Sequence, residues 1–282
     1  MMLSPSTKNQ DTNLHKSTTN CHEKNLSLFV PIRVRSCLFV LALICPTLAI
    51  LLRGQTVLAI PATVPSDTRF TITEQIDADD FTHGLDHWSS ELENGGNITA
   101  SDGVLDIDVP AGASIWFKTK LIGPLMIQYR IMAMSNAGPN DRVSDANCFW
   151  MANDSRNKAD FFAVHRSGEF ADYNQLLTYY VGLGGNGNTT TRFRRYVGDA
   201  VDRPLLPRND LHDPVDLIKP NQEMLFQLVA ADHLIQFYRD GKKLFEMDDT
   251  QPYSSGYFAY RTTKSHLRIR DFAVYRLKLN SQ

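Results

Sequence analysis

The stretch LIQFYRDGKKLFE, residues 234–246, decides the fold class. Two runs of strand-forming residues are joined there by Asp240-Gly241, and an Asp-Gly pair between two such runs is a strong local signal for a β-hairpin. A second pair, Asp102-Gly103, precedes residues 104–109 (VLDIDV), in which apolar and acidic residues alternate. Alternation with a period of two indicates a strand with one buried face. Both features predict antiparallel β-structure, in both halves of the chain.

Outward from these segments, short apolar runs separated by Gly, Pro and Asp continue along the chain, and we find no amphipathic helix longer than two turns. The further expected strands are residues 70–73, 115–121, 125–134, 147–151, 160–165, 256–260 and 267–277. Many short strands with turn signals between them are typical of a sandwich or jelly roll. We therefore predict an all-β sandwich, a single jelly-roll domain spanning residues 70–278.

The overall composition is that of an ordinary globular protein, with 282 residues, 43% of them hydrophobic, and a net charge of −2. A chain with so little net charge is not expected to bind nucleic acid in general, although a local cluster of arginines can still bind an anion. Composition therefore directs attention to local clusters of charge.

The first 59 residues predict export. Residues 1–32 are polar and lack apolar periodicity, so we expect a disordered leader. Residues 33–59 contain a basic flank, an apolar run at 37–52 and the small-residue pattern at 57–59, which together indicate a secretory signal peptide. An uncleaved N-terminal anchor is the alternative, and it would supply the only membrane contact that we expect. The domain is expected to be secreted or periplasmic, with residues 60–69 as a linker.

Cysteine usage agrees with this organisation. Cys21, Cys37 and Cys45 precede the predicted cleavage site, so Cys148 alone remains in the mature chain. We therefore expect no internal disulfide and no cysteine metal site. The domain must be stabilised by its hydrophobic core, which a chain of about 220 residues can supply.

Four motifs resemble one known superfamily. They are DDF…GL…W at 79–88, DG.L.I at 102–107, FYRDGKKLFE at 237–246, and G.FAYR…L.IRDFAVYRL at 256–277. Together they resemble the concanavalin A-like lectin/glucanase superfamily, in particular bacterial single-domain members found in polysaccharide-utilisation clusters. The resemblance covers residues 70–278. It implies a jelly roll whose concave sheet carries a sugar groove, and it leaves glycosidases, polysaccharide lyases and binding modules open, because fold alone does not determine activity.

Residues 179–196, YYVGLGGNGNTTTRFRRY, combine more hydroxyl, guanidinium and phenol groups than a core needs. Residues 182–187 match the G-x-G-x-x-G dinucleotide fingerprint, but that motif requires a helix to follow, and threonines and alternating arginines follow here. We therefore expect a hairpin or bulge between two strands and no nucleotide partner. The arginine cluster favours an anionic polysaccharide as ligand.

This composition fits β-elimination at a uronic acid. Arg, Asn, Gln or His must neutralise the substrate carboxylate, and a Tyr or His moves the proton. The candidate catalytic residues are Tyr179, Tyr180, His165, Arg192 and Arg194. On a strand, residues 192, 194 and 196 share one face and residues 193 and 195 share the other, so only one of the two adjacent tyrosines can face a groove.

Further residues are candidates for substrate binding because they are polar or aromatic and lie in or near this region, or near the end of the domain. They are Tyr173, Asn174, Gln175, Asn188, Arg195, Tyr196, Trp150, Arg208, His212 and Arg261. Residues 203–216, rich in Pro and Asp, are expected to form an ordered surface loop at one side of the groove. For the aromatic residues and His165, packing in the core is the competing interpretation.

Other functions remain open. A non-catalytic carbohydrate-binding module would use the same residues only to hold sugar, and a structural adhesion domain would not need the arginine cluster. A retaining glycoside hydrolase of this superfamily needs two carboxylates about 5 Å apart. The chain lacks the corresponding Glu-x-Asp-x-x-Glu strand, and Glu91 and Glu93 are interpreted as solvated.

We expect no required cofactor. Jelly rolls similar to this one often hold a structural Ca²⁺ between the first and last strands. Asp79 or Asp80 with Asp271 could supply oxygen ligands for such a site.

Overall fold

A computed structural model describes residues 59–199, 201 and 203–281, within the unit Gly54–Gln282. The predicted leader, the signal segment up to residue 58 and the three N-terminal cysteines lie outside the described residues. Within the described part, no helix is long and apolar enough to cross a membrane.

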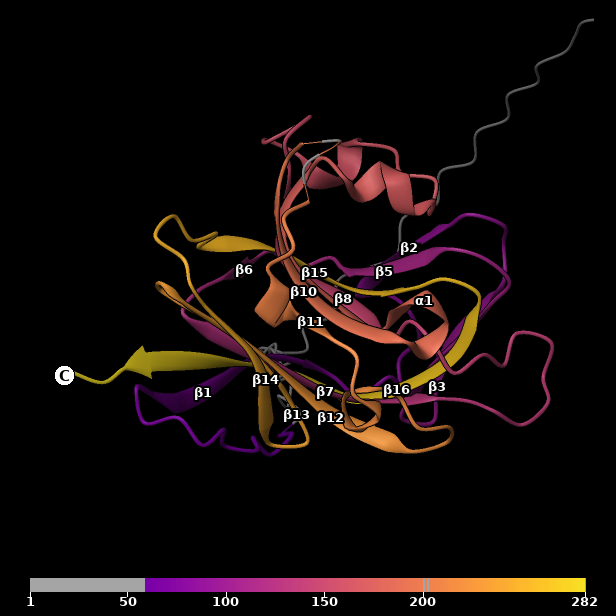
Figure 1. Ribbon diagram of the computed structural model, residues 1–282, viewed down its shortest axis with the longest axis horizontal. Helices are drawn as coiled ribbons and strands as arrows, with labels where there is room; N and C mark the ends of the chain where they lie inside the picture. The colour runs from indigo at the N-terminus through magenta and orange to yellow at the C-terminus, as the bar shows by residue number, and fades with distance from the viewer. Residues whose placement is uncertain (1–58, 200, 202, 282) are drawn as a thin grey trace, which may run out of the picture. The chain divides into compact units, whose positions relative to one another are not determined.

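Two antiparallel sheets form the sandwich (Figure 1). Sheet A has the order β14 (Lys242–Asp248), β13 (Leu234–Arg239), β12 (Glu223–Ala231), β7 (Leu125–Ala133), β16 (Ser265–Leu279), β4 (Val104–Val109) and β3 (Asn97–Ser101), and β1 (Phe70–Asp79) also pairs with β16. Sheet B has the order β11 (Asp210–Leu211), β10 (Thr190–Val197), β9 (Leu176–Gly184), β8 (Asn147–Asp154), β15 (Ser255–Thr262), β5 (Ala113–Phe117) and β2 (Trp88–Leu92), and β6 (Leu121–Ile122) also pairs with β15. The predicted all-β jelly roll is confirmed.

Alternating residues build the core between the sheets. In β4, Leu105, Ile107 and Val109 are fully buried, while the intervening aspartates lie on the other face. The predicted hairpin of β13 and β14 turns at Asp240 and Gly241, whose φ values of 52° and 78° are those of the turn that suits a two-residue hairpin. Glycine tolerates this positive φ at no steric cost.

Each sheet is also covered on its outer face. Residues 60–63 lie over sheet A, where the Ile60 carbonyl accepts from Tyr275 and Thr63 donates to Gln128. Residues 155–175, here named the cap, lie over the face of sheet B that points away from sheet A (Figure 1). The cap contains two 3-10 turns, η1 (Phe161–Ala163) and η2 (Phe170–Tyr173).

One predicted strand is wrong. Residues 160–165 form η1 and the loop after it, because the Asp160 carboxylate accepts the backbone N–H groups of Phe162 and Ala163 at 3.0 and 3.2 Å. An aspartate that caps a turn in this way competes with strand pairing. Phe161 of this segment packs onto the outer face of sheet B, where its ring contacts Trp116.

The glycine-rich segment forms the predicted hairpin. Strands β9 and β10 pair antiparallel through α1 (Gly185–Asn188), a four-residue turn in which Asn186 and Gly187 have φ values of 53° and 70°. The predicted loop at 203–216 is partly regular, with η3 (Pro207–Asn209), the short edge strand β11 and η4 (Pro214–Asp216).

Candidate functional site

Polar residues from neighbouring strands line up in one row across the outer face of sheet B. Glu91 pairs with Ser114, Ser114 with Arg261, and Arg261 with Asn147. The pair Cys148↔Val181 sets Asn147 beside the next residue of β9, Gly182, which pairs with Arg192, and Arg192 pairs with Asp210. From β2 to β11 the row therefore reads Glu91, Ser114, Arg261, Asn147, Gly182, Arg192 and Asp210.

Tyr180 brings a phenol to this row. Its cross-strand partners are Phe149 and Arg194, which lie two residues along their strands from Asn147 and Arg192. A Cβ atom added to Gly182 would lie only 2.9 Å from the Tyr180 hydroxyl oxygen. The hydroxyl therefore occupies the space above Gly182, between the positions of Asn147 and Arg192. Any larger residue at 182 would displace it.

The adjacent tyrosine faces the opposite way, as strand geometry requires. Tyr179 is buried between the sheets and donates a 2.6 Å hydrogen bond to Asp249. The Arg195 guanidinium donates to the same carboxylate at 2.7 Å and lies over the ring of Tyr253. Tyr179 and Arg195 are thus structural residues, which corrects their assignment to the site and leaves Tyr180 as the tyrosine on the outer face.

The electrostatics keep the phenols of this face neutral. Burial raises the pKa of Tyr180 well above its usual value, the neighbouring Tyr196 and Asp145 raise it further, and Arg261 opposes the shift. Burial also raises the pKa of Tyr196, against the lowering effect of Arg203. Both hydroxyl groups are therefore protonated near neutral pH, and Tyr180 can act as a proton donor.

Basic side chains gather at the β10–β11 end of the row. Arg192 forms a two-pronged ion pair with Asp210 at 2.8 and 3.1 Å, and His212 lies 3.1 Å from the same carboxylate. Arg194 donates to the carbonyl of Arg203, and burial lowers the pKa of Arg194. Arg208 is exposed on η3. The arginines Arg192, Arg194 and Arg208 gather at this end, and such a local cluster can attract an anion.

Arg261 holds the cap against the sheet. The side chain is 1% exposed and donates to the Gly168 carbonyl at 2.5 Å. Its guanidinium lies 4.9 Å from the ring centre of Tyr173 and 5.4 Å from that of Phe170. The Arg261 Nε and Nη2 groups have no hydrogen-bond acceptor within the described residues.

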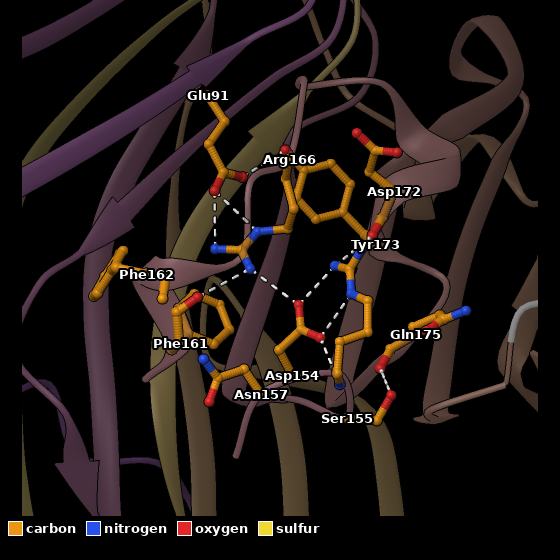
Figure 2. A network of polar contacts seen from close by, with 12 residues as sticks. Glu91, Asp154, Ser155, Asn157, Phe161, Phe162, Arg166, Asp172, Tyr173 and Gln175 are labelled. Carbon is orange, nitrogen blue, oxygen red and sulfur yellow. Dashed lines mark hydrogen bonds and ion pairs between the residues drawn. The ribbon is translucent and has the colours of Figure 1, made fainter. Parts of the chain in front are cut away.

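A buried ionic network fixes the other end of the cap (Figure 2). Arg166 forms ion pairs with Glu91 at 2.9 Å and with Asp154 at 3.0 Å, and its side chain is fully buried. Glu91 also accepts hydrogen bonds from Trp116 and Tyr173, each at 2.8 Å. These contacts join β2, β5, β8 and the cap.

The network corrects the interpretation of Glu91 as solvated, while Glu93 is exposed as expected. Glu91 has four buried or half-buried donor contacts, and Glu93 accepts the Gly112 N–H at 2.8 Å. Burial raises the pKa of Asp154, but the hydrogen bonds and charge of Arg156, with that of Arg166, outweigh burial and hold the pKa below its usual value. The residues around Glu91 are mostly polar, and nothing in their pattern indicates that Glu91 has a buried partner.

Several predicted binding residues are used by the fold itself. Trp150 is fully buried between the rings of Tyr179 and Phe193, so it presents no face to a ligand. The Asn188 amide exchanges two 2.9 Å hydrogen bonds with the backbone of Ile218.

The predicted site residues that belong to the cap lie at different positions in the structure. Tyr173 is buried and bonded to Glu91, and Asn174 ends η2. The Gln175 carbonyl accepts from Ser155 at 2.8 Å. His165 is exposed on the cap beside β2, away from Tyr180. The structure therefore brings together Tyr180, Tyr196, Arg192, Arg194 and Arg261, and it leaves His165 out.

The three aspartates predicted to bind Ca²⁺ have different partners. Asp79 accepts from Phe81 and Trp88, Asp80 accepts from Thr82, and Asp271 forms an ion pair with Arg130 at 3.2 Å. Within the described residues no group of three or more His, Cys, Asp or Glu side chains could hold a metal ion. The predicted set does not form a common site.

Three solved structures with a similar fold are distant from this chain in sequence. A protein of unknown function with a galectin-like fold from Bacillus subtilis has 16% identity and a TM-score of 0.59, covering 75% of this chain and 100% of its own. An endo-β-1,3-glucanase from Pyrococcus furiosus has 12% identity and a TM-score of 0.50, covering 73% and 95%. β-Agarase A from Zobellia galactanivorans has 12% identity and a TM-score of 0.50, covering 78% and 98%.

These likenesses show the concanavalin A-like jelly-roll fold that the motifs implied. Among curated protein sequences, none matches the chain. A family model described as "Domain of unknown function (DUF6250)" matches residues 107–272, from the middle of β4 to the middle of β16. Because that match spans more than half of the sequence, the chain belongs to the DUF6250 family.

Proposed function

We propose that this protein is carbohydrate-active and acts outside the cytoplasm on an anionic, uronate-containing polysaccharide by β-elimination. Two enzymes with a similar fold, the endo-β-1,3-glucanase and β-agarase A, carry names that refer to polysaccharides. The basic group at the β10–β11 end supports an anionic ligand in place of a neutral one. Because the cap covers much of the outer face of sheet B, the ligand is expected at its β10–β11 end, where Arg192 and Arg208 are accessible.

One observation carries the proposal. The Tyr180 hydroxyl lies above Gly182, in the row between Asn147 and Arg192. A uronate needs an amide or guanidinium at its carboxylate and a phenol at its C5 proton, because the carboxylate charge otherwise opposes removal of that proton. This arrangement puts the phenol between an amide and a guanidinium.

In the proposed reaction Tyr180 takes part in two proton transfers, one from C5 of the sugar and one to the leaving oxygen. Tyr180 as phenolate takes the C5 proton, and the electron pair of the C5–H bond forms the C4–C5 double bond. The C4–O bond breaks, and the leaving oxygen takes a proton from the phenol. Asn147 and Arg192 stabilise the negative charge that grows on the substrate carboxylate in between. No oxidant or reductant is consumed.

A glycoside hydrolase fits this face less well. Three of its carboxylates, Glu91, Asp154 and Asp210, are each bound to an arginine. Hydrolysis requires one protonated and one ionised carboxyl group facing the same glycosidic bond. Hydrogen bonds and charge of neighbouring arginines hold the pKa values of Asp154 and Asp210 below the usual value, so these two groups suit the role of the protonated acid poorly.

The second candidate function is a non-catalytic carbohydrate-binding module. Tyr180 is only 6% exposed, and its raised pKa leaves little phenolate at neutral pH. Both facts oppose a role as base, whereas holding an anionic chain at the arginines of the β10–β11 end requires no proton transfer.

The test is absorbance near 235 nm, where an unsaturated uronide absorbs, with the purified protein and a panel of uronate polysaccharides. A rise on at least one polymer is expected. Retention on one of these polymers without any rise in absorbance would exclude the lyase and leave a binding module. A protein that is neither retained nor active on any member of the panel would contradict the carbohydrate function itself.

The pH profile gives a second expected result. If Tyr180 is the base, its raised pKa means that the phenolate fraction, and with it kcat/KM, rises about tenfold per pH unit between pH 7 and 9. Initial rates at subsaturating substrate measure this slope. A plateau or a maximum near pH 7 would assign the base to another group.

A further inference from the structure

A cavity of about 300 Å³ lies beside β2, on the other side of the cap from the β10–β11 end. It is lined by residues 89–92 of β2 and by Phe162 and residues 164–167 of the cap. Its volume is at the lower end of the range for small-molecule sites, about 300–1,000 Å³. Nothing in the proposed lyase chemistry uses this cavity.

The cavity combines an aromatic side with polar groups. Phe162 is 37% exposed, and its position is held by edge contacts with Phe161 and Tyr257 at 5.2 and 5.0 Å between ring centres. In Figure 2, Phe162 lies on the side of the buried network opposite Asp172 and Gln175. A rigid, exposed ring beside a polar cavity suits a ligand with one apolar and one polar side.

The polar groups are hydroxyls, an imidazole and a strand edge. Ser89, Ser90 and the exposed His165 line the cavity. β2 is the last strand of sheet B in the described residues, so the backbone on one of its edges has no partner strand. The floor is the ion pair of Glu91 and Arg166, in which the Arg166 Nη2 group lies 2.9 Å from the carboxylate yet is not aligned for a hydrogen bond.

We propose that this cavity is a second carbohydrate subsite, which binds one sugar residue through the Phe162 ring and through hydrogen bonds to His165 and the Ser89 hydroxyl. The proposal rests on the proposed carbohydrate function. Trp116 donates a hydrogen bond to Glu91 at the floor of the cavity and so marks its position on sheet B. Trp116 is three strands from Tyr180, which is roughly 14 Å at the usual spacing of about 4.8 Å between strands. One sugar ring cannot reach both places, so the subsite distinguishes long chains from short ones.

The test compares Phe162→Ala and His165→Ala with the wild type. Dissociation constants are measured by calorimetry for di-, tetra- and hexasaccharides prepared from whichever polysaccharide the wild type retains. We expect Phe162→Ala to weaken hexasaccharide binding about tenfold, as truncation of an anchoring aromatic does, and to leave disaccharide binding unchanged. His165→Ala should act on the same oligosaccharides with a smaller effect. Ile122→Ala, which removes another exposed apolar side chain, is the matched control and should change neither.

The outcomes separate the two proposals. If the wild type binds no polysaccharide, the carbohydrate function fails. If the wild type binds and Phe162→Ala binds every chain length equally well, the subsite alone is wrong. Equal weakening for all chain lengths would also overturn it, because that result places Phe162 at the primary site or in the fold.

Discussion

Replacing Arg166 by Met is expected to lower the free energy of unfolding by about 3–5 kcal/mol, because it leaves the Glu91 carboxylate without its cation and Asp154 with Arg156 as its remaining partner. The Arg166 and Asp154 side chains are fully buried and that of Glu91 is 13% exposed, so water cannot replace the lost partner. The change also removes the guanidinium that lies 4.1 Å from the centre of the Phe161 ring. Denaturant unfolding followed by tryptophan fluorescence measures the loss.

A matched control separates burial from charge. Arg268 forms a 2.8 Å ion pair with Asp106 on the exposed surface of sheet A, with 48% of its side chain accessible. Arg268→Met should cost less than about 1 kcal/mol, since exposed ion pairs contribute little. Similar losses for both variants would show that the network at Glu91 does not stabilise the fold more than a surface pair.

A second variant tests the cause directly. Glu91→Gln added to Arg166→Met removes the charge that has lost its cation while keeping a similar shape, and Asp154 stays paired with Arg156. The double variant should recover a large part of the stability lost by Arg166→Met, because the cost comes from unpaired buried charge. No recovery would indicate that packing of the arginine stem, and not charge, holds the cap.

Local patterns were sufficient to predict the architecture. The Asp-Gly pairs at 102–103 and 240–241 both occupy positive φ values between paired strands, and the alternating segment 104–109 is β4. These features depend on interactions between residues close in sequence, so they can be recognised in a single sequence. The same holds for the opposite orientations of Tyr179 and Tyr180.

Contacts between distant residues could not be predicted in this way. Glu91 meets Arg166 across 75 residues, and Tyr179 meets Asp249 across 70. Nothing in the sequence around Glu91 or Asp249 indicates whether the carboxylate is buried with a partner or exposed to solvent. The cap shows the same limit, because Asp160 converts an apolar run that fits a strand into a 3-10 turn that covers one.

The register of sheet B supplied what composition alone could not. Asn147 was not among the candidate residues, yet it lies in the row between Arg261 and Gly182. His165 was a candidate by composition, yet the cap carries it to the β2 side. Proximity in sequence to the tyrosine and arginine cluster was therefore a poor guide to proximity on the sheet.

Replacing Tyr180 by Phe is expected to lower kcat by at least about 100-fold on the polymer that the wild type cleaves, because a positioned proton-transfer group contributes about 10²–10⁴-fold. The ring of Phe keeps the contacts with Phe149 and Tyr196, at 4.9 and 5.5 Å between centres, so the fold should be retained. Absorbance near 235 nm under saturating substrate measures kcat. Retained binding of the polymer to the variant checks that only the chemical step is affected.

The neighbouring tyrosine is the matched control, since it differs by one position and by the face it occupies. Tyr179→Phe removes the hydroxyl that donates to Asp249 and accepts from the Tyr253 N–H at 3.0 Å. It should cost about 1–3 kcal/mol of stability, because two buried polar groups lose their partner, and leave kcat within about twofold of the wild type. The opposite pattern, with activity lost in Tyr179→Phe and kept in Tyr180→Phe, would place the chemistry between the sheets and contradict the assignment of the outer face of sheet B.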